Sequence, residues 1–312
     1  MTDTQGPLRT TVVQFGAGGI GRGFAAPLFC EAGRETLFVD VDADLVAALN
    51  ERRAYPLALL GPHRREERTV GPVRALHAGD APAVVRELAR CEFAATAVGV
   101  GILPRLAATL AAGVRTRRAA GAGPLDVILC ENQLHCAEGL WEALRPELTA
   151  AEAGSLGLVE SAVGRTVPLV SPEQRARDPL WIAADDYPHL IAARAGFRGL
   201  VPAVPGLRVV EDLQPYADRK LLGHNMAHAV AAYLGAAAGY ETVQAALADH
   251  EIAECVGRAL DAVAPALARR HGFAPEEMRA WRADLDLRLR NPQLPDAIAR
   301  VGRDPLRKLG PE

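Results

Sequence analysis

The sequence predicts an α/β protein in which an N-terminal, doubly wound sheet of mostly parallel strands is followed by a mainly α-helical C-terminal domain. Three observations predict this fold. A glycine cluster at residues 16–21 separates a β-branched run from a helical segment. Strand-like and helix-like segments then alternate as far as residue 163, which is typical of a parallel sheet covered by helices. From Asp212 onward, nearly every segment has helical periodicity.

Length and composition set the outer limits of this prediction. A chain of 312 residues exceeds one ordinary domain, and we expect one domain at residues 1–194 and another at residues 195–312. With 49% hydrophobic and 23% charged residues, the composition is that of a soluble globular protein. The formal net charge of -3, with acidic residues interleaved among the arginines, argues against a nucleic-acid partner. We expect a monomer or a small homo-oligomer.

The prediction of a cellular location depends mainly on the lack of a membrane span and of a signal peptide in the sequence. No stretch approaches the roughly 20 uncharged apolar residues that a membrane span needs, and residues 1–9 have no apolar signal core behind them. Five scattered cysteines in a chain of this size are expected to be reduced thiols. The sequence therefore predicts a cytoplasmic protein with no membrane partner.

The elements of the first domain follow from apolar periodicity. Strands are expected at the β-branched or apolar runs, residues 11–15, 36–39, 93–98, 127–130 and 156–163. Helices are expected at residues 24–32, 43–53, 81–90, 105–112 and 137–148. Residues 56–75 contain strand-like fragments and are left unassigned, and residues 115–123 are expected to form a basic loop.

Beyond residue 168 the pattern changes. Residues 181–184 and 190–193 are expected to form a pair of added strands. The second domain is then expected to hold helices at residues 215–238, 241–250, 252–271, 275–284 and 295–301.

The glycine cluster matches G-x-G-x-x-G, with Gly16, Gly18 and Gly21 at the glycine positions and Gly19 and Ile20 between the last two. The pattern alone is weak, but here it follows a strand and opens a helix, as the binding of a dinucleotide requires. The first glycine permits the tight turn, the second lets the backbone approach a pyrophosphate, and the third allows helix and strand to pack closely. A Rossmann-type dinucleotide site is therefore predicted; the alternative is a glycine-rich turn without a ligand.

An acidic residue at the end of the second strand indicates which dinucleotide binds. Asp40 stands where a carboxylate binds the adenosine ribose of NAD. Asp42 and Asp44 follow it, and three carboxylates there would repel the 2′-phosphate of NADP. NAD is therefore the expected cofactor. Capping of the next helix, the other role for an acidic residue here, suits Asp42 better.

The second informative stretch is a predicted helix that contains Lys220, Asn225 and His228. Asn225 and His228 are three residues apart and share a helical face, and Lys220 lies about 80° round from His228 at roughly 100° per residue. Transfer of a hydride from a secondary alcohol to nicotinamide requires loss of the hydroxyl proton, which a lysine of lowered pKa can accept. An amide and an imidazole N–H can hold the developing alkoxide. The structural alternative is an exposed lysine, a buried amide and a surface histidine.

The scarcity of lysine favours the chemical interpretation. Of the 35 basic residues, only Lys220 and Lys308 are lysines. Where any positive charge suffices, this chain uses arginine. A lysine that remains is therefore the better candidate for a group that must lose a proton near neutral pH.

These patterns together resemble the polyol-specific long-chain dehydrogenases, the family of the mannitol dehydrogenases. The likeness covers nearly the whole chain. The motifs that carry it are FGAGGIGRG (residues 15–23), TAVG (96–99), CEN (130–132), the K-x-x-x-x-N-x-x-H helix with AAYLG (231–235) beyond it, and RVGRDPLRKL (300–309).

The resemblance implies a metal-independent enzyme in which Lys220 is the general base and Asn225, His228 and Asn132 polarise the substrate oxygen. It implies that Val98, in the TAVG motif, lies at the cofactor. The reaction it implies is the NAD-dependent interconversion of D-mannitol 1-phosphate and D-fructose 6-phosphate.

The resemblance also implies a substrate contact from the arginines near the C-terminus. Arg307 is the best match, and Arg303 is a further candidate from this region. Arg165, in the middle of the chain, is another candidate for substrate contact. No metal is expected, because Cys130, Glu131, His135 and Cys136 lack the spacing of a structural zinc module.

Two departures from the family leave alternatives open. The family usually carries Val-Asp-Arg where this chain has Val163-Gly164-Arg165, so a substrate-facing carboxylate is missing. Relatives are expected to continue beyond Glu312, which raises the possibility of a chain truncated at its C-terminus. The alternatives are another polyol or hexonate dehydrogenase of the mannitol 2-dehydrogenase or fructuronate reductase type, and a catalytically silent NAD-binding protein.

Overall fold

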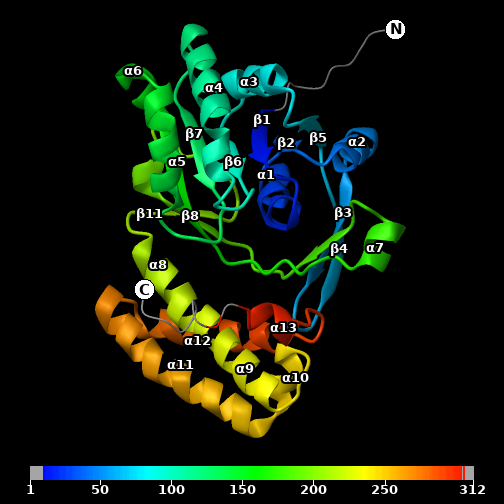
Figure 1. The fold of residues 1–312 in the computed structure, drawn as a ribbon. Helices are drawn as coiled ribbons and strands as arrows, with labels where there is room; N and C mark the ends of the chain where they lie inside the picture. The colour runs from blue at the N-terminus through cyan, green and yellow to red at the C-terminus, as the bar shows by residue number, and fades with distance from the viewer. Residues whose placement is uncertain (1–9, 304, 306–312) are drawn as a thin grey trace. The chain divides into compact units, whose positions relative to one another are not determined.

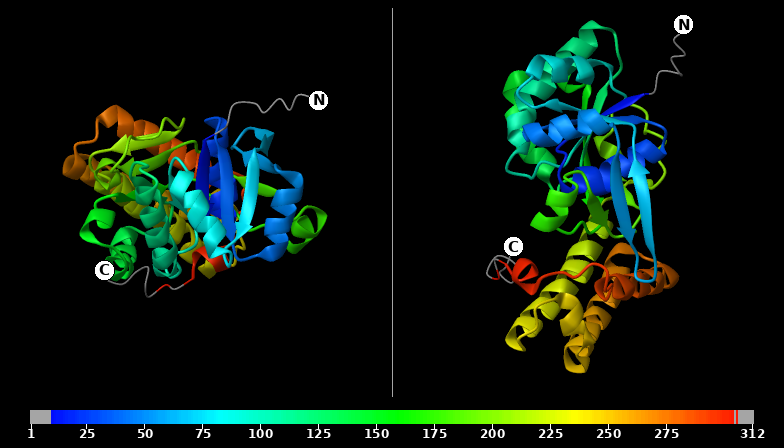
Figure 2. Two further views of the ribbon diagram at one scale, coloured as in Figure 1. Left: turned by 90° about the horizontal axis from the view of Figure 1, so that it is seen from above. Right: turned by 90° about the vertical axis from the view of Figure 1, so that its right-hand side faces the viewer.

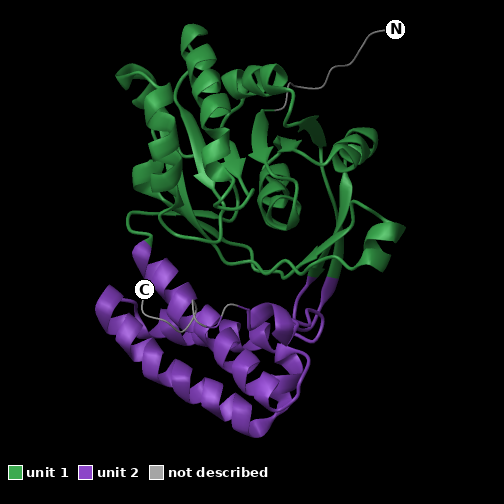
Figure 3. Ribbon diagram, in the orientation of Figure 1, with its two compact units in different colours: residues 1–59, 66–213 green, residues 60–65, 214–312 purple. Residues whose placement is uncertain are grey.

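The computed structural model describes residues 10–303 and 305. The chain divides into two compact units, residues 1–59 with 66–213 and residues 60–65 with 214–312 (Figure 3). The predicted α/β unit and helical unit are both confirmed. Residues 195–213 nevertheless belong to the first unit, because their strand β11 (Leu207–Val210) pairs with β10 (Leu190–Ala193) at the edge of its sheet. The boundary therefore follows Leu213 rather than Arg194.

The main sheet of the first unit has the strand order β11-β10-β8-β7-β6-β1-β2-β5 (Figure 1). Its other strands are β1 (Thr11–Phe15), β2 (Glu35–Asp40), β5 (Val73–His77), β6 (Ala94–Thr96), β7 (Leu125–Leu129) and β8 (Leu156–Val163). The strands from β8 to β5 pair in parallel, whereas β10 pairs antiparallel with β8. The carboxyl ends of the parallel strands therefore meet at one edge, where ligands bind in open α/β sheets.

Helices cover both faces of this sheet (Figures 1 and 2). They are α1 (Ala26–Glu31), α2 (Ala43–Arg52), α3 (Ala81–Arg90), α4 (Ala107–Ala119) and α5 (Cys136–Leu144), with the short α6 (Ala150–Ala153). Another short helix, α7 (Pro172–Arg177), follows β8 in the chain and has no buried residues. Alternate strand residues enter two apolar layers: Val13 packs in the layer that contains Leu88 and Leu110, and Val12 in the layer that contains Phe29. This is the doubly wound arrangement that the sequence predicts.

A small second sheet contains most of residues 56–75, the segment with strand-like fragments. Its order is β4-β3-β9, formed by β3 (Tyr55–Leu60), β4 (Arg65–Val70) and β9 (Ile182–Ala184). The two added strands expected at residues 181–184 and 190–193 are both present, but they do not pair with each other: β9 pairs with β3, and β10 joins the main sheet. Both are short buried runs, and their partners are distant in the sequence.

The prediction of a basic loop at residues 115–123 is also wrong. Helix α4 continues through most of this stretch, to Ala119. Arg117 is buried, and its guanidinium donates to the carbonyls of Leu88, Cys91 and Gly123. Cations are also stabilised at the C-terminal end of a helix, so the arginine run is a helix end.

The second unit is mainly helical, with the hairpin of residues 60–65 added to it. Its helices are α8 (Gln214–Arg219), α9 (Met226–Ala237), α10 (Val243–Ala248), α11 (His250–His271), α12 (Pro275–Leu289) and α13 (Ile298–Val301). The core of this unit joins α9, α10, α11 and α12 through Ala231, Val243, Leu260 and Leu285. Within the part of the chain that the structure describes, no helix has the length and apolar character needed to cross a membrane.

Candidate active site

The glycine loop lies between β1 and a π-helical turn, η1 (Gly21–Ala25), at the carboxyl edge of the sheet. Gly16 has a φ of 88°, and a Cβ there would collide with the carbonyl group of Ala97. A Cβ at Gly21 would collide with the carbonyl oxygen of Gly16. Both positions therefore require glycine for the turn and for close packing.

The middle of the glycine loop is open. Gly18 and Gly19 are exposed, and Ile20 is half-buried. Among the described residues, no atom other than those of Gly18 and its chain neighbours lies within 4 Å of the place that a Cβ of Gly18 would take. A diphosphate could therefore approach the backbone closely here, facing N–H groups at the start of the helix. These residues fit a dinucleotide.

Asp40 lies directly beside this loop at the end of β2. Its carboxylate accepts hydrogen bonds from the N–H of Ala17 at 2.6 Å and from the N–H of Asp42 at 3.0 Å. Asp42 in turn caps α2 by accepting from the N–H of Leu45. As predicted, Asp42 rather than Asp40 caps α2. The carboxylate of Asp40 bonds to the glycine loop instead.

Val98 follows β6 at the same edge of the sheet. The N–H groups of Val98 and Gly99 donate to the carboxylate of Glu131 at 3.1 and 2.8 Å, and Glu131 is buried. A Cβ at Gly16 would contact Val98 at 3.2 Å. Glu131, to which the sequence assigned no role here, thus fixes the turn that places Val98 beside the glycine loop.

Asn132 lies beyond the end of β7 and is exposed. The helix that follows it, α5, has His135 at its N-cap position. The N–H of Ala137 donates to Glu160 of β8 at 2.6 Å. Asn132 is therefore not the cap of this helix, and it remains a candidate for substrate contact at the sheet edge.

Arg165, predicted to contact substrate, is buried. Its guanidinium donates to the carbonyls of Gly23 at 3.1 Å and Tyr187 at 2.8 Å, and lies 4.9 Å from the ring centroid of Phe24. Burial lowers the pKa of this guanidinium. These contacts hold the helical segment after the glycine loop, which favours a structural role.

Gly164 follows β8 at the carboxyl edge of the sheet. A Cβ at Gly164 would lie 2.5 Å from Cε1 of Tyr187 and 3.3 Å from Cζ, the carbon that carries the hydroxyl. The tyrosine ring therefore fills the space that a side chain at position 164 would need.

In the second unit, Lys220 and Asn225 are the first and last residues of a π-helical turn, η5 (Lys220–Asn225), between α8 and α9. The N–H of Met226 bonds to the carbonyl of Leu221, five residues back. An unbroken α-helix would separate residues five apart by about 140°. The i→i+5 bonding of a π turn instead brings Lys220 and Asn225 one turn apart on the same face.

Packing fixes this turn from two sides. A Cβ at Gly223 would collide with the indole ring of Trp281 on α12. The guanidinium of Arg219, directly before Lys220, lies 4.7 Å from the ring centroid of Phe273 and forms an ion pair with Glu277 at 2.7 Å. The backbone that carries Lys220 is therefore held by aromatic and charged contacts.

Lys220 is half-buried. Burial, and after it the positive charge of Arg288, lowers the pKa of Lys220 to about 8. Arg288 lies on α12 two turns after Trp281, on the same helix face, and pairs with Asp284 at 3.7 Å. An amine with a pKa near 8 can gain and lose a proton near neutral pH, as a general acid–base group must.

His228 is held between a second histidine and a carboxylate. Its ring lies against that of His224, with centroids 4.6 Å apart and planes at 77°. Its Nε2 lies 3.4 Å from Oδ2 of the buried Asp296. Burial, followed by the charges of His228, Arg288 and Lys220, lowers the pKa of His224 well below its ordinary value. Lys220, His224 and His228 thus share one environment, of which the sequence identified two members.

The remaining sequence candidates are less informative. Arg303 is exposed, and Arg307 lies outside the described residues. The described residues contain no group of three or more His, Cys, Asp or Glu side chains that could hold a metal ion. Burial raises the pKa of the Cys130 thiol to about 12.

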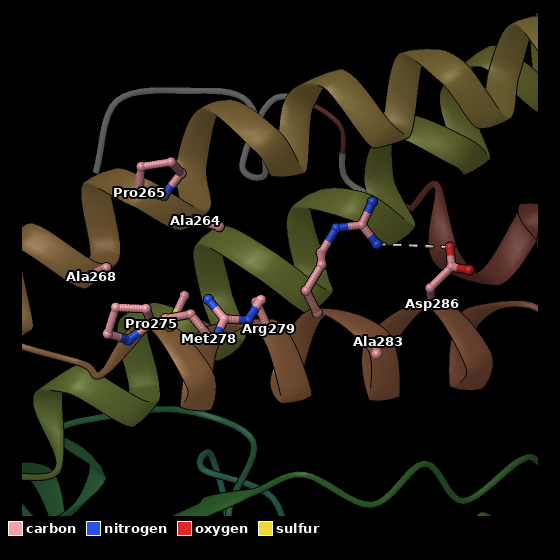
Figure 4. A pocket seen from close by; sticks show the side chains of 9 residues that line it. Ala264, Pro265, Ala268, Pro275, Met278, Arg279, Ala283 and Asp286 are labelled. Carbon is pink, nitrogen blue, oxygen red and sulfur yellow. Dashed lines mark ion pairs between the residues drawn. The ribbon is translucent and has the colours of Figure 1, made fainter.

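A groove of about 640 Å³ lies elsewhere in the second unit, between α11 and α12 (Figure 4). None of the predicted catalytic residues lines it. Its walls are formed by Ala264, Pro265, Ala268, Pro275, Met278, Arg279, Arg282, Ala283 and Asp286. The groove is lined by the face of α12 opposite to Trp281 and Arg288, so it is not part of the predicted site.

Two family models match this chain. The mannitol dehydrogenase Rossmann domain matches residues 10–205 and the mannitol dehydrogenase C-terminal domain matches residues 212–312. The chain is 40% identical to a mannitol-1-phosphate 5-dehydrogenase of Brevibacillus brevis over 301 residues, which cover 95% of this chain and 77% of that protein. It is 39% identical to one of Geobacillus thermodenitrificans over 303 residues, which cover 96% and 78%.

Solved structures show the same fold at low sequence identity. A D-sorbitol dehydrogenase in substrate-free form has a TM-score of 0.82 at 19% identity, covering 96% of this chain and 74% of that one. A Pseudomonas fluorescens mannitol 2-dehydrogenase, in a ternary complex with NAD and D-mannitol, has a TM-score of 0.76 at 20% identity, covering 94% and 71%. Since both family models and these relatives match nearly the whole chain, it belongs to the mannitol dehydrogenase family.

Proposed function

We propose that this protein is an NAD-dependent dehydrogenase that interconverts D-mannitol 1-phosphate and D-fructose 6-phosphate. The observation that carries the reaction type is the half-buried Lys220, whose pKa is about 8 and which shares a π turn with Asn225. The substrate pair is supported by relatives of 35% to 40% identity over about 95% of the chain that are named mannitol-1-phosphate 5-dehydrogenases. Because these substrates are intermediates of sugar metabolism, we also propose a cytoplasmic site of action.

The first unit would hold the cofactor. The open backbone at Gly18 would take the diphosphate, Asp40 the adenosine ribose, and Val98 would border the nicotinamide half. The carboxylate of Asp40, already at the N–H of Ala17, favours NAD because it would repel the 2′-phosphate of NADP. When bound, NAD supplies the nicotinamide that accepts a hydride from the substrate carbon.

Asn132 and residues of the second unit would bind the substrate oxygen and transfer its proton. In the oxidation direction, the Nζ of Lys220 accepts the hydroxyl proton while the electron pair of the C–H bond leaves as hydride. In the reduction direction, the same ammonium group returns the proton to the oxygen. The amides of Asn225 and Asn132 donate hydrogen bonds to that oxygen, which carries the developing negative charge, and His228 contacts the same end of the substrate.

A ketose panel tests this function. We expect NADH oxidation with fructose 6-phosphate, and much slower oxidation with fructose, with fructuronate, or when NADPH replaces NADH. Turnover of fructose or fructuronate without turnover of the phosphate ester would overturn the substrate. NADH binding without reduction of any ketose would favour a silent NAD-binding protein.

A second candidate function is favoured by one observation. At Gly164, where the family usually carries an aspartate, the ring of Tyr187 fills the available space. A changed wall at this strand end would suit another polyol or hexonate. The panel includes fructose and fructuronate for this reason.

A further inference from the structure

We propose that His77 is a positioning residue for the cofactor, because it fixes the peptide group that orients the carboxylate of Asp40. The inference rests on the proposed function, in which Asp40 binds the adenosine ribose of NAD. It assigns a role to a histidine outside the predicted site residues, at the end of β5.

His77 lies opposite Asp40 at the carboxyl edge of the main sheet. The two residues are the last pair in the register of β2 and β5. Beyond this pair, the N–H of Ala78 donates to the carbonyl of Asp40 at 2.8 Å. The imidazole of His77 continues the connection, since its Nε2 lies 3.0 Å from the carbonyl oxygen of Val41. The turn after β2 is therefore bonded to the end of β5 at two successive residues.

The contacts of the ring determine where its proton lies. The N–H of Gly79 donates to Nδ1 of His77 at 3.1 Å. A backbone N–H can only donate, so Nδ1 is the acceptor and the ring proton is on Nε2. The carbonyl oxygen of Val41 can only accept, and the Nε2–H is the donor that faces it. The neutral Nε2–H imidazole thus makes both bonds, whereas a proton on Nδ1 would remove the bond from Gly79.

The peptide group between Val41 and Asp42 connects this histidine with Asp40. Its carbonyl oxygen accepts from His77, and its N–H donates to Oδ1 of Asp40 at 3.0 Å. A trans peptide is planar, with its C=O and N–H on opposite sides, so a bond to one group fixes the direction of the other. His77 therefore determines how this N–H meets the carboxylate of Asp40.

Hydrogen bonds rather than side-chain packing hold this peptide group. Val41 is 77% exposed, so its side chain contributes little apolar contact. The other oxygen of Asp40, Oδ2, accepts from the N–H of Ala17 in the glycine loop at 2.6 Å. The carboxylate is thus held between the glycine loop and the peptide group that His77 fixes. Its remaining lone pairs are the acceptors for the ribose hydroxyl groups.

The turn after β5 brings the ring to this position. The carbonyl of His77 accepts from the N–H of Asp80 at 2.9 Å, and Asp80 then caps α3 by accepting from the N–H of Ala83. A Cβ at Gly79 would lie 2.9 Å from Nδ1 of His77, so glycine lets the imidazole lie against the turn. The structural alternative is that His77 serves this turn alone, and the experiment must separate its two bonds.

Two substitutions separate the bond to Val41 from the bond within the turn. The side-chain oxygen of asparagine is attached to Cγ, as Nδ1 of histidine is, and asparagine often accepts from the N–H two residues on. We expect His77→Asn to keep the bond from Gly79, but its amide ends short of the position of Nε2. The longer amide of His77→Gln reaches that position, so this variant should keep the bond to Val41 and lose the one from Gly79.

Binding of NADH, measured by its fluorescence without substrate, is the readout. We expect the Kd for NADH to rise about two- to tenfold in His77→Ala and His77→Asn, as for one lost hydrogen bond, and to stay near the wild-type value in His77→Gln. ADP-ribose, which lacks the nicotinamide and is measured by displacement of NADH, should lose affinity by the same factor. The kcat at saturating NADH should be unchanged. The matched control is Asn50→Ala, which removes two bonds to the backbone of Ala75 on the same strand and should bind NADH as the wild type does.

Several outcomes would overturn the proposal. Wild-type affinity in His77→Asn, with or without a loss in His77→Gln, would mean that the ring serves only the turn. An equal loss of affinity in Asn50→Ala and His77→Ala would mean that any loosening of β5 has this effect. Should His77→Ala not fold, the asparagine and glutamine variants decide the question. A wild type that does not bind NADH would contradict the proposed function itself, whereas NADH binding that is unchanged in the variants would contradict only the role of His77.

Discussion

At the scale of single residues, the chemistry depends on a lysine whose surroundings favour its uncharged form. Lys220 is half-buried on a helix whose neighbours include Arg288, and both effects lower its pKa, burial more than charge. Arginine could not replace it, because a guanidinium stays protonated at any pH at which the protein is folded. This is a physical reason for a lysine here in a chain that otherwise uses arginine.

The first prediction removes this amine. We expect Lys220→Met to lower turnover of fructose 6-phosphate on the order of a hundredfold or more, because no group then returns the proton. Binding of NADH, measured by its fluorescence, should be unchanged, since the predicted cofactor residues belong to the first unit. Near-normal turnover would remove Lys220 from the mechanism.

The second prediction concerns pH. The neutral amine is the base in alcohol oxidation, so kcat/KM for the polyol should rise as pH increases through about 8, and the ketose reduction, which needs the ammonium form, should fall over the same range. Arg288→Gln removes a positive charge that lowers the pKa of Lys220. Both profiles should therefore move to higher pH.

A control separates this effect from a general change in charge. Arg279→Gln removes an exposed arginine of the same helix, paired with Glu276 at 2.8 Å, and should leave the profiles in place. Profiles that shift equally in both variants, or in neither, would contradict a specific action of Arg288 on Lys220.

The residues that sequence alone could identify are those whose partners are close in the chain. Asn225 and His228 belong to one local motif with Lys220, and His224 could have been added, since it lies one helical turn before His228. Arg288 and Asp296 could not be identified. Arg288 acts on His224, and Asp296 lies beside His228, because α12 and the loop before α13 pack against η5 and α9. The periodicity of the sequence does not predict that packing.

At the scale of elements, the segment that follows the glycine loop and the segment that carries Lys220 each contain a π-helical turn. In η1 the N–H of Ala26 bonds to the carbonyl of Gly21, and in η5 the N–H of Met226 bonds to that of Leu221. Sequence periodicity cannot show such a turn, because one extra residue per turn leaves the composition of the helix unchanged. The angle of about 80° expected between Lys220 and His228 applies to an unbroken α-helix, and the π turn changes it.

The third prediction tests the packing that holds η5. A Cβ at Gly223 would collide with the ring of Trp281. A Cβ at Gly257, within α11, would have no atom of the described residues within 4 Å apart from its chain neighbours and the nearby backbone of its own helix. We expect Gly223→Ala to cost about 1–3 kcal/mol of the free energy of unfolding and to lower kcat. Gly257→Ala, the matched control, should be stabilising by about 0.5–1 kcal/mol with kcat unchanged.

Urea denaturation and fructose 6-phosphate kinetics measure both effects. Equal stability changes in the two variants would show that the contact with Trp281 is not tight. A destabilised Gly223→Ala with normal kcat would show that the position of the turn does not matter to the reaction.

At the scale of the whole molecule, the sequence predicted the two-unit organisation but not how the chain is shared between the units. The alternation of strands and helices indicates a parallel sheet where strands that are close in the sequence pair with each other. Residues 60–65 carry no such signal, yet they belong to the second unit although β3 and β4 belong mostly to the first. The chain therefore passes between the units at three places rather than at one boundary.

Side chains from the loop after α12 hold this hairpin. The Nδ2 of Asn291, a buried residue, donates to the carbonyl of Leu60 at 2.8 Å. The Nε2 of Gln293 donates to the carbonyls of Gly61 at 2.5 Å and Arg64 at 3.1 Å. Loss of the Asn291 bond leaves a buried carbonyl unpaired, which costs about 1–3 kcal/mol. Because the hairpin continues into β3 and β4, loss of this hydrogen bond should destabilise segments of both units.

The last prediction follows from this connection. In hydrogen exchange followed by mass spectrometry, we expect Asn291→Ala to speed exchange in β3, in β4 and in the loop after α12 together. The control is Asn50→Ala, whose amide also bonds to the backbone twice, to the N–H and carbonyl of Ala75 within the first unit. It should speed exchange near β5 and leave the second unit unchanged. Faster exchange confined to the second unit in Asn291→Ala would mean that the hairpin does not couple the two units.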